Sequence, residues 1–185
     1  MKIMIFFLLT ITCVLLQAQT HETSYVFEKS EKLIAMTAFP EDHFKELTDL
    51  DTLKRQETRR VRQWVDTEND SGTVRLRVFP IENKRITNYL TDVSRFQQYT
   101  CAQHDQEILS QTDAELSLFT QCIMAFDQEI NTLHKVLEGR YALYIFERIF
   151  NKNMQPEQLE LWHQFLRRLE ICNNNIAYCR QMPGL

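Results

Sequence analysis

The chain has 185 residues, of which 21 are basic and 25 acidic, and its formal net charge is −4. A mildly acidic chain has no electrostatic reason to bind nucleic acid or an anionic membrane, and this length is enough for one domain with a sizeable core. The 3 glycines are few for hairpin turns or a phosphate-binding loop, which argues against a β-sandwich and against a G-rich nucleotide site.

The first 18 residues are predicted to be a cleaved secretory signal peptide. Lys2 supplies a positive start, Ile3 to Leu16 form an apolar run, and Ala18 offers a small residue at the cleavage site. The run is shorter than the roughly 20 residues that a transmembrane helix needs. Residues 19–185 are therefore expected to form a single domain that is secreted to the extracellular space, where cysteines can pair.

The expected fold of this domain is all-α, a four- to five-helix bundle stapled by disulfides. Glutamine, leucine, glutamate and arginine are plentiful and favour helix. Helical spacing of apolar residues predicts helices over about 23–37, 41–66, 82–109, 112–149 and 156–172.

One segment of the chain departs from helical spacing. Residues 74–78 alternate apolar and basic side chains, which is strand periodicity. A single short strand has no partner in a helical bundle. We therefore expect a short extended crossover segment near 74–80, with Val74, Leu76 and Val78 packed inward.

The last two predicted helices carry local signals at their ends. Thr112 and Glu115 have the spacing of a capping box, which marks a helix start. Gly139 falls inside the apolar run that follows, so this helix either continues through it or ends after residue 138. Pro156 and Glu157 suit the first turn of the final helix.

Four cysteines remain after the signal peptide removes Cys13, and they predict two disulfides with three possible connectivities. They are Cys101, Cys122, Cys172 and Cys179. A bridge between Cys101 and Cys122 would join two antiparallel helices that turn near 111–112, and the other pair can join if 173–175 unwinds. The alternatives are bridges from the last segment to the third and fourth helices, or buried thiols. The wide cysteine spacing argues against a zinc site, and no metal or cofactor is expected.

No catalytic motif stands out, so an enzyme is not expected. The five histidines are scattered and form no H-E-x-x-H pattern, and the chain has no G-x-S-x-G elbow. Because triads assemble in space rather than in sequence, a cleft that brings His104, His134 or His163 onto carboxylates would indicate an enzyme after all.

The order of signal peptide, helical bundle and two disulfides resembles that of helical cytokines. The resemblance implies a protein that acts by binding an extracellular protein partner or receptor, as a cytokine-like ligand or a secreted effector or inhibitor. The candidate partner contacts are Lys54, Arg55, Arg59, Arg62, Arg167 and Arg168. The alternative interpretation of these basic residues is a solvent-exposed helix face without a partner. Asn69 begins an N-glycosylation acceptor in a polar loop, so the protein is expected to be a glycoprotein.

The alternative function is a carrier of a small hydrophobic ligand in an inter-helix cavity. The fourth predicted helix is rich in aromatic residues that could line such a cavity or fill a core. They are Phe119, Phe126, Tyr141, Tyr144, Phe146 and Phe150.

Overall fold

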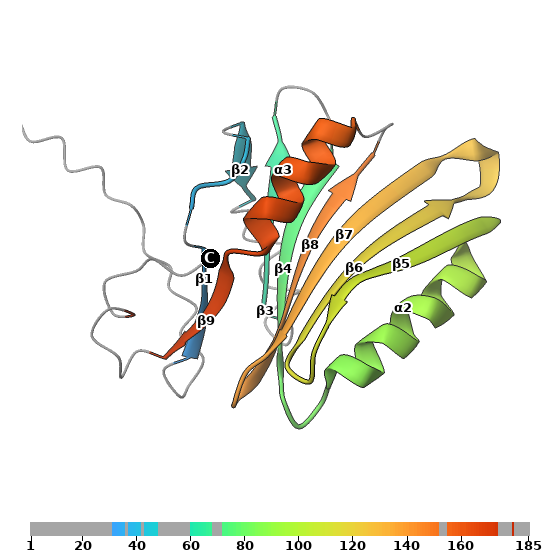
Figure 1. Cartoon of the computed structure of the whole chain (residues 1–185). Coiled ribbons are helices and arrows are strands. Elements are labelled where there is room, and N and C mark those ends of the chain that lie inside the picture. Colours follow the sequence, from blue (N-terminus) through green and yellow to red (C-terminus); the bar gives the residue numbers. More distant parts are fainter. Residues whose placement is uncertain are drawn as a thin grey trace, which may run out of the picture.

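A seven-stranded antiparallel sheet forms the centre of the molecule (Figure 1). The computed structural model describes residues 31–35, 37–41, 43–47, 60–67, 72–151, 155–173 and 179. From one edge of the sheet to the other, the strands are β2 (Phe44–Glu46), β3 (Arg60–Asp66), β4 (Gly72–Pro80), β8 (Ala142–Phe150), β7 (Glu129–Glu138), β6 (Glu115–Ile123) and β5 (Gln103–Gln111). The other described elements are α2 (Ile86–Thr100), a 3-10 turn (Ala125–Asp127), α3 (Pro156–Leu166), and a two-stranded ribbon of β1 (Glu31–Ala35) and β9 (Leu169–Asn173).

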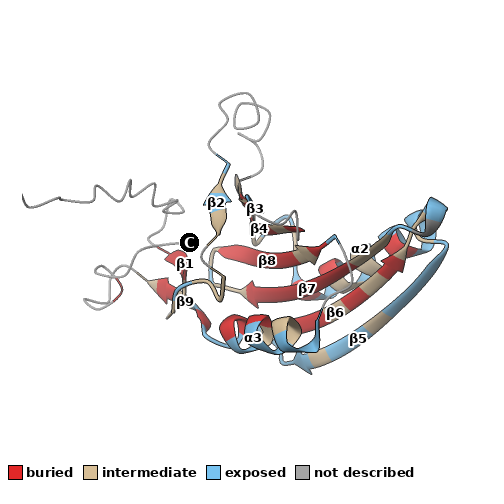
Figure 2. Ribbon diagram, turned by 90° about the horizontal axis from the view of Figure 1, so that it is seen from above, coloured by how far each residue is buried: buried red, intermediate tan, exposed pale blue. Residues whose placement is uncertain are grey.

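The sheet carries one helix on each of its faces, which we call the α2 face and the α3 face (Figures 1 and 2). On β8, Ile145 belongs to the core cluster of Tyr89 from α2, whereas Phe146 packs against Phe165 from α3. The β1–β9 ribbon adds Leu33 to the α3-side core. Each face of the central strands is therefore buried under its own helix.

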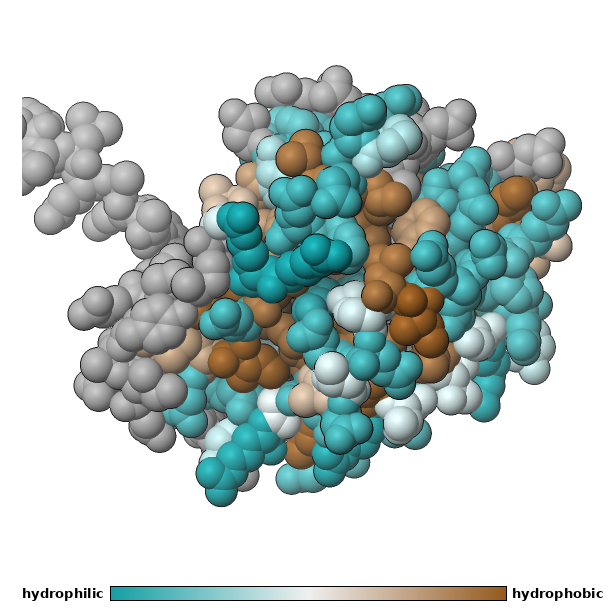
Figure 3. Space-filling view, in the orientation of Figure 1, coloured by the Kyte–Doolittle hydropathy of each residue, from teal (hydrophilic) through white to brown (hydrophobic). Residues whose placement is uncertain are grey.

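Burial falls off toward the β5 edge of the sheet. In Figure 2 most of β7 and β8 is buried, whereas β5 is largely exposed. From the side shown in Figure 3, hydrophobic areas lie near the centre and hydrophilic side chains surround them. Some apolar side chains thus reach the surface on that side, within a hydrophilic surround.

The all-α bundle expected from the sequence is wrong, because most of the described chain is β-sheet. The central strands β7 and β8 are buried on both faces, so apolar residues fill consecutive positions and the two-residue alternation disappears. The spacing of residues in a long apolar run is then compatible with a buried helix as well as with a buried strand. Tyr144 and Ile145, which both fall in the helix predicted over 112–149, lie on opposite faces of the sheet.

The expected crossover near 74–80 is strand β4, which pairs with β3 on one side and β8 on the other. Val74, Leu76 and Val78 are buried toward α3, as their alternation predicted. Arg75 and Arg77 consequently lie on the α2 face. The strand signal was sound, and the error was to interpret its partners as helices.

Two signals interpreted as helix features belong to turns between strands. The Thr112 hydroxyl accepts a hydrogen bond from the backbone N–H of Ala114, and the Thr112 N–H donates to the carbonyl of Glu115. Thr112 thus closes the β5–β6 hairpin instead of capping a helix. Gly139 lies in the turn between β7 and β8, where an added Cβ would sit 2.0 Å from Glu31 Oε1.

The scarcity of glycine did not exclude a sheet, because other residues make the turns. Phe126, in the turn between β6 and β7, has a φ of 67°, in the left-handed region where glycine is usual. The β5–β6 hairpin turns through residues 112–114 without any glycine. The inference from composition assumed that hairpins need glycine, and these do not.

Parts of two predicted helices are confirmed. The segment 82–109 contains α2, but the helix ends at Thr100 and β5 follows it. The last helix begins at Pro156 with Glu157 in its first turn, as predicted, yet it ends at Leu166 and its expected continuation forms β9. In the segments 23–37 and 41–66, the described residues form strands β1, β2 and β3.

The structure contains both local disulfides, Cys101–Cys122 and Cys172–Cys179, with Cα–Cα distances of 5.3 and 5.5 Å. The chain does turn near 111–112, but Cys101 and Cys122 are brought level by the β5–β6 hairpin rather than by two helices. Among the described residues, no helix combines the length and the apolarity needed to cross a membrane. Paired cysteines are compatible with an extracellular protein.

Candidate binding cleft between α2 and the sheet

A cleft of about 380 Å³ lies between α2 and the α2 face of the sheet. Its apolar lining includes Val93, Phe96, Met124, Ile130 and Ile149. Its polar lining includes Arg75, Arg77, Lys84, Tyr89, Asp92, Gln97, Thr120, Thr132, His134 and Glu147. Most of these sheet residues occupy alternate positions on β4, β6, β7 and β8, so strand periodicity gathers them on one face.

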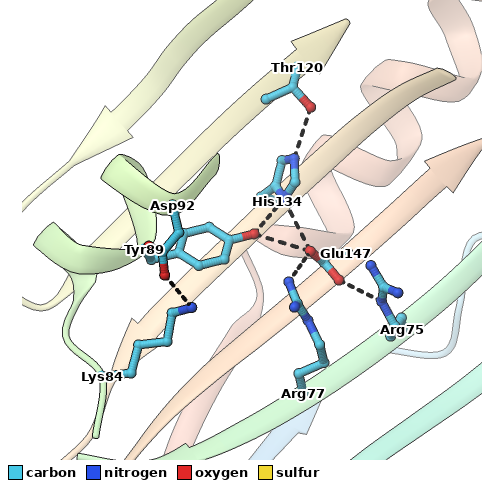
Figure 4. A network of polar contacts seen from close by, with 8 residues as sticks. All are labelled: Arg75, Arg77, Lys84, Tyr89, Asp92, Thr120, His134 and Glu147. Atoms are coloured by element: carbon cyan, nitrogen blue, oxygen red, sulfur yellow. Dashed lines mark hydrogen bonds and ion pairs between the residues drawn. The ribbon is translucent and has the colours of Figure 1, made fainter. Parts of the chain in front are cut away.

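Glu147 is the centre of the polar contacts in the cleft (Figure 4). Its carboxylate accepts hydrogen bonds from Arg75 Nε at 2.7 Å, Arg77 Nη2 at 2.5 Å and the Tyr89 hydroxyl at 3.1 Å. His134 Nδ1 lies 3.5 Å from the same carboxylate. Glu147 is 2% exposed, so these partners from β4, α2 and β7 take the place of water.

This network fixes the charge states of its members. Burial alone would raise the pKa of Glu147, but the hydrogen bond with His134 and the charges of Arg77 and Arg75 outweigh it and hold that pKa well below its ordinary range. Burial, with the nearby carboxylate, raises the pKa of Tyr89 well above its usual value. Glu147 is therefore ionised and Tyr89 is a neutral donor at physiological pH.

The contacts of His134 limit where its protons can be. Its Nδ1 lies 2.7 Å from the Tyr89 hydroxyl, and its Nε2 lies 2.9 Å from Thr120 Oγ1. Because Tyr89 donates to Glu147, its oxygen must accept from Nδ1–H of His134. A proton on Nδ1 thus satisfies every contact, and Nε2 either accepts from Thr120 or, in the imidazolium, donates to it.

The order hydroxyl, imidazole and carboxylate in this network resembles a hydrolytic triad, and it meets the condition set above for an enzyme. A triad also needs donors for an oxyanion. Thr120 lies inside β6, with β5 pairing it on one side and β7 on the other. The backbone N–H groups around it are engaged in these ladders, and both His134 nitrogens have partners within the protein.

Lys84 and Asp92 form a second ion pair at the cleft, with Lys84 Nζ 2.8 Å from Asp92 Oδ2. The Lys84 ammonium also lies 5.1 Å from the centre of the Phe79 ring and 5.5 Å from that of Tyr89. Asp92 is half exposed, with a side-chain exposure of 51%. Lys84 is thus held over the polar floor of the cleft, while its carboxylate partner faces water.

Gln97 lies further along α2 and presents an unused acceptor. Its Nε2 donates to the backbone carbonyls of Asp105 and Gln121, each at 3.2 Å. These two bonds fix the amide orientation, because the flipped amide would place its oxygen against two carbonyls. The Oε1 atom is then buried with no hydrogen-bond partner among the described residues.

A second buried polar cluster, on the α3 face, has a structural role. Arg148 is fully buried, and its guanidinium lies 4.3 to 5.1 Å from the rings of Phe44, Phe150 and Trp162. Both Arg148 Nη2 and Trp162 Nε1 donate to Glu41 Oε2. Burial lowers the pKa of Arg148 to about 10, although Glu41 opposes this shift. The cluster joins the segment before β2 to β8 and α3.

The structure does not gather the predicted partner contacts into one site. Arg62 lies on β3 and binds Glu46 through Nε and Nη2, both at 2.6 Å. Arg167 and Arg168 are exposed in the turn between α3 and β9. Lys54, Arg55, Arg59, Asn69 and residues 1–18 lie outside the described residues. Partner binding and glycosylation at these positions stay predictions.

Because the fold is not a helical bundle, the expected cytokine-like function and the expected carrier function in an inter-helix cavity are both wrong. A cytokine-like bundle needs packed helices, and here two helices are separated by a sheet. The aromatic residues assigned to an inter-helix cavity are dispersed instead. Tyr144, Phe146 and Phe150 are buried in the α3-side core, and Phe126 is fully exposed.

The sequence analysis noted His134 and the basic positions of 74–78 but did not connect them, and it gave Glu147, Tyr89 and Lys84 no part in a site. The alternation in β4 was the available signal, since it placed two arginines on one side of a strand. Within the described part of the chain, no three His, Cys, Asp or Glu side chains converge as metal ligands. In comparisons with known proteins, no family model and no curated protein matches this chain, so its function has to be inferred from the cleft itself.

Proposed function

We propose that the protein binds a small amphiphilic molecule in the cleft between α2 and the sheet. The proposal rests on one observation: the lining of this cleft combines apolar side chains with a cluster of converging polar groups. A volume of about 380 Å³ lies within the range of roughly 300–1,000 Å³ that small-molecule sites occupy. The apolar body of the ligand would lie against Val93, Phe96 and Ile130.

We propose binding rather than catalysis at this site. Both nitrogens of His134 are engaged with Tyr89 and Thr120, and Glu147 is engaged with two arginines. A hydroxyl nucleophile also needs oxyanion donors, and the backbone N–H groups around Thr120 are engaged in the ladders with β5 and β7. The saturated contacts support a rigid, preorganised floor for a bound ligand.

We further propose that this binding takes place outside the cell. The apolar N-terminal run supports secretion, as do the two disulfides, which persist in oxidising compartments. Expression with the native leader in secreting cells, followed by mass spectrometry of the medium, tests this. Recovery of the chain only inside the cells would contradict it.

The binding proposal is tested with the mature protein and a neutral fluorescent probe, N-phenylnaphthylamine. Ile130→Trp places a larger side chain in the cleft lining, and Ile108→Trp makes the same change on exposed β5, away from the cleft. We expect the wild-type protein and I108W to bind the probe, and I130W to bind at least about tenfold more weakly. Equal binding by I130W, or no binding by the wild-type protein, would refute the proposal.

A further inference from the structure

We infer that the polar end of the ligand is negatively charged, held by Arg75, Arg77 and Lys84, and that the ligand carries a hydrogen-bond donor further along, facing Gln97. This inference rests on the proposed function and narrows it to one ligand class. The anion could be a carboxylate or a phosphate ester, since both suit guanidinium and ammonium donors.

The charges that line the cleft do not balance. Arg75, Arg77 and Lys84 carry three positive charges, and the two carboxylates of Asp92 and Glu147 carry two negative ones. One positive charge remains even with His134 neutral. The carboxylate of Asp92 is half exposed to water, whereas that of Glu147 is buried. The surplus therefore favours an anion within the cleft.

The arginines retain donors that a ligand could use. Each guanidinium has five N–H groups, and the hydrogen bonds of Arg75 and Arg77 to Glu147 involve one nitrogen of each. The Nε of Arg77 is buried with no hydrogen-bond partner among the described residues. Arg75 remains 35% exposed, so its guanidinium is accessible from the cleft.

A cationic ligand is disfavoured by the same contacts. Glu147 already accepts from Arg75, Arg77 and Tyr89, which leaves it little capacity for an ammonium group. An incoming cation would also face two guanidinium groups at close range. Like charges at such distances repel, and more strongly where water is excluded.

Gln97 specifies the second polar feature of the ligand. It is 3% exposed, it lines the cleft, and its Oε1 lacks a partner. A buried acceptor without a partner is costly, and a ligand hydroxyl or amide N–H would remove that cost. Tyr89 and Gln97 are eight positions apart on α2, which is about 12 Å along the helix axis at 1.5 Å per residue. Gln97 therefore lies about two helical turns beyond Tyr89 and the network of Glu147, further along the cleft from the proposed anion.

Four ten-carbon probes test the inference through displacement of N-phenylnaphthylamine. They are decanoic acid, decanol, decylamine, and decanoic acid with a terminal hydroxyl. We expect decanoic acid to bind at least about tenfold more tightly than decanol, and decylamine to bind most weakly. The hydroxylated acid should bind more tightly than decanoic acid.

Variants assign these preferences to residues. Lys84→Met should reduce the preference for acid over alcohol, while Lys45→Met, at an exposed position of β2, should leave it unchanged. Gln97→Leu should abolish the gain from the terminal hydroxyl without altering the acid preference. Thermal unfolding of each variant establishes that it is folded.

Each outcome separates this inference from the proposed function. If acid, alcohol and amine bind equally, and all are weakened by I130W, the cleft binds amphiphiles but the inference of an anion is wrong. If the preference for acid over alcohol persists in both Lys84→Met and Arg77→Met, the anion binds elsewhere and the inference is also wrong. Failure of all four probes to bind would overturn the proposed function and this inference together.

Discussion

Replacing Glu147 by glutamine should destabilise the protein by about 3 kcal/mol at about pH 7. Removing one member of a buried ion pair costs roughly 3–5 kcal/mol, because the remaining charge loses its partner. Here two guanidinium groups lose their shared carboxylate. Their side chains are 35% and 25% exposed, so water relieves part of the loss and the lower end of the range applies.

The loss of stability caused by the same substitution should depend on pH. The folded-state pKa of Glu147 lies below its unfolded value, so its contribution is complete above the unfolded pKa of about 4.3. It is lost as the pH falls toward the folded value, because protonation then favours the unfolded state. The difference between wild type and E147Q should shrink by about 1 kcal/mol between about pH 4.3 and pH 3.3.

The assay is urea unfolding followed by the fluorescence of the buried tryptophans Trp64 and Trp162, measured from neutral to acid pH. Asp92→Asn is the matched control, since it removes a carboxylate from an exposed ion pair and should cost less than about 1 kcal/mol. An E147Q protein as stable as wild type at neutral pH would refute the reasoning. So would a stability difference that does not change in acid.

Three further variants test the packing on both faces of the sheet by the same unfolding assay. Gly72→Ala should cost about 2–5 kcal/mol, because φ is 134° and the new Cβ would lie 1.9 Å from the Ile149 carbonyl oxygen; an unchanged midpoint would show that this strand end is misplaced. Arg148→Lys should cost about 3 kcal/mol or more, since an ammonium cannot stack between three aromatic rings, and a neutral effect would contradict that packing. Replacing Cys101 and Cys122 together by alanine should cost about 3 kcal/mol for a loop of this length, and unfolding that is insensitive to their loss would argue against the bridge.

The sequence predicted local features of this fold better than its class. Pro156 marked the start of α3, and the alternation from Val74 to Val78 gave the buried side of β4. Both signals depend on near neighbours in the chain. The local disulfide between Cys101 and Cys122 also followed from a turn placed near residue 112, although strands rather than helices flank that turn.

The class was missed because the decisive contacts are distant in sequence. Strand β4 pairs with β8, about seventy residues later, as in the pair Arg75 and Glu147. Side chains of β7 and β8 are buried on both faces and show no alternation. Ile145 belongs to the core under α2 and Phe146 to the core under α3. This division follows from the pairing of β8 within the sheet and not from the local sequence.

The candidate site was missed for the same reason. Glu147 and Arg148 are adjacent charges within an otherwise apolar run, and the partners of Glu147 come from β4, α2 and β7. A buried carboxylate in such a run requires partners. That requirement was the one signal in the sequence that could have drawn attention to this position.

Chemical-shift mapping with isotope-labelled protein and decanoic acid tests the central claim most directly. The account predicts that backbone amide shifts concentrate on α2 and on the strands that line the cleft, with the largest changes near Arg77, Lys84 and Gln97. Decanol should move the apolar subset of these resonances and leave those near Lys84 largely in place. Shifts centred on α3 or on the β1–β9 ribbon, or no saturable shifts at all, would contradict the account.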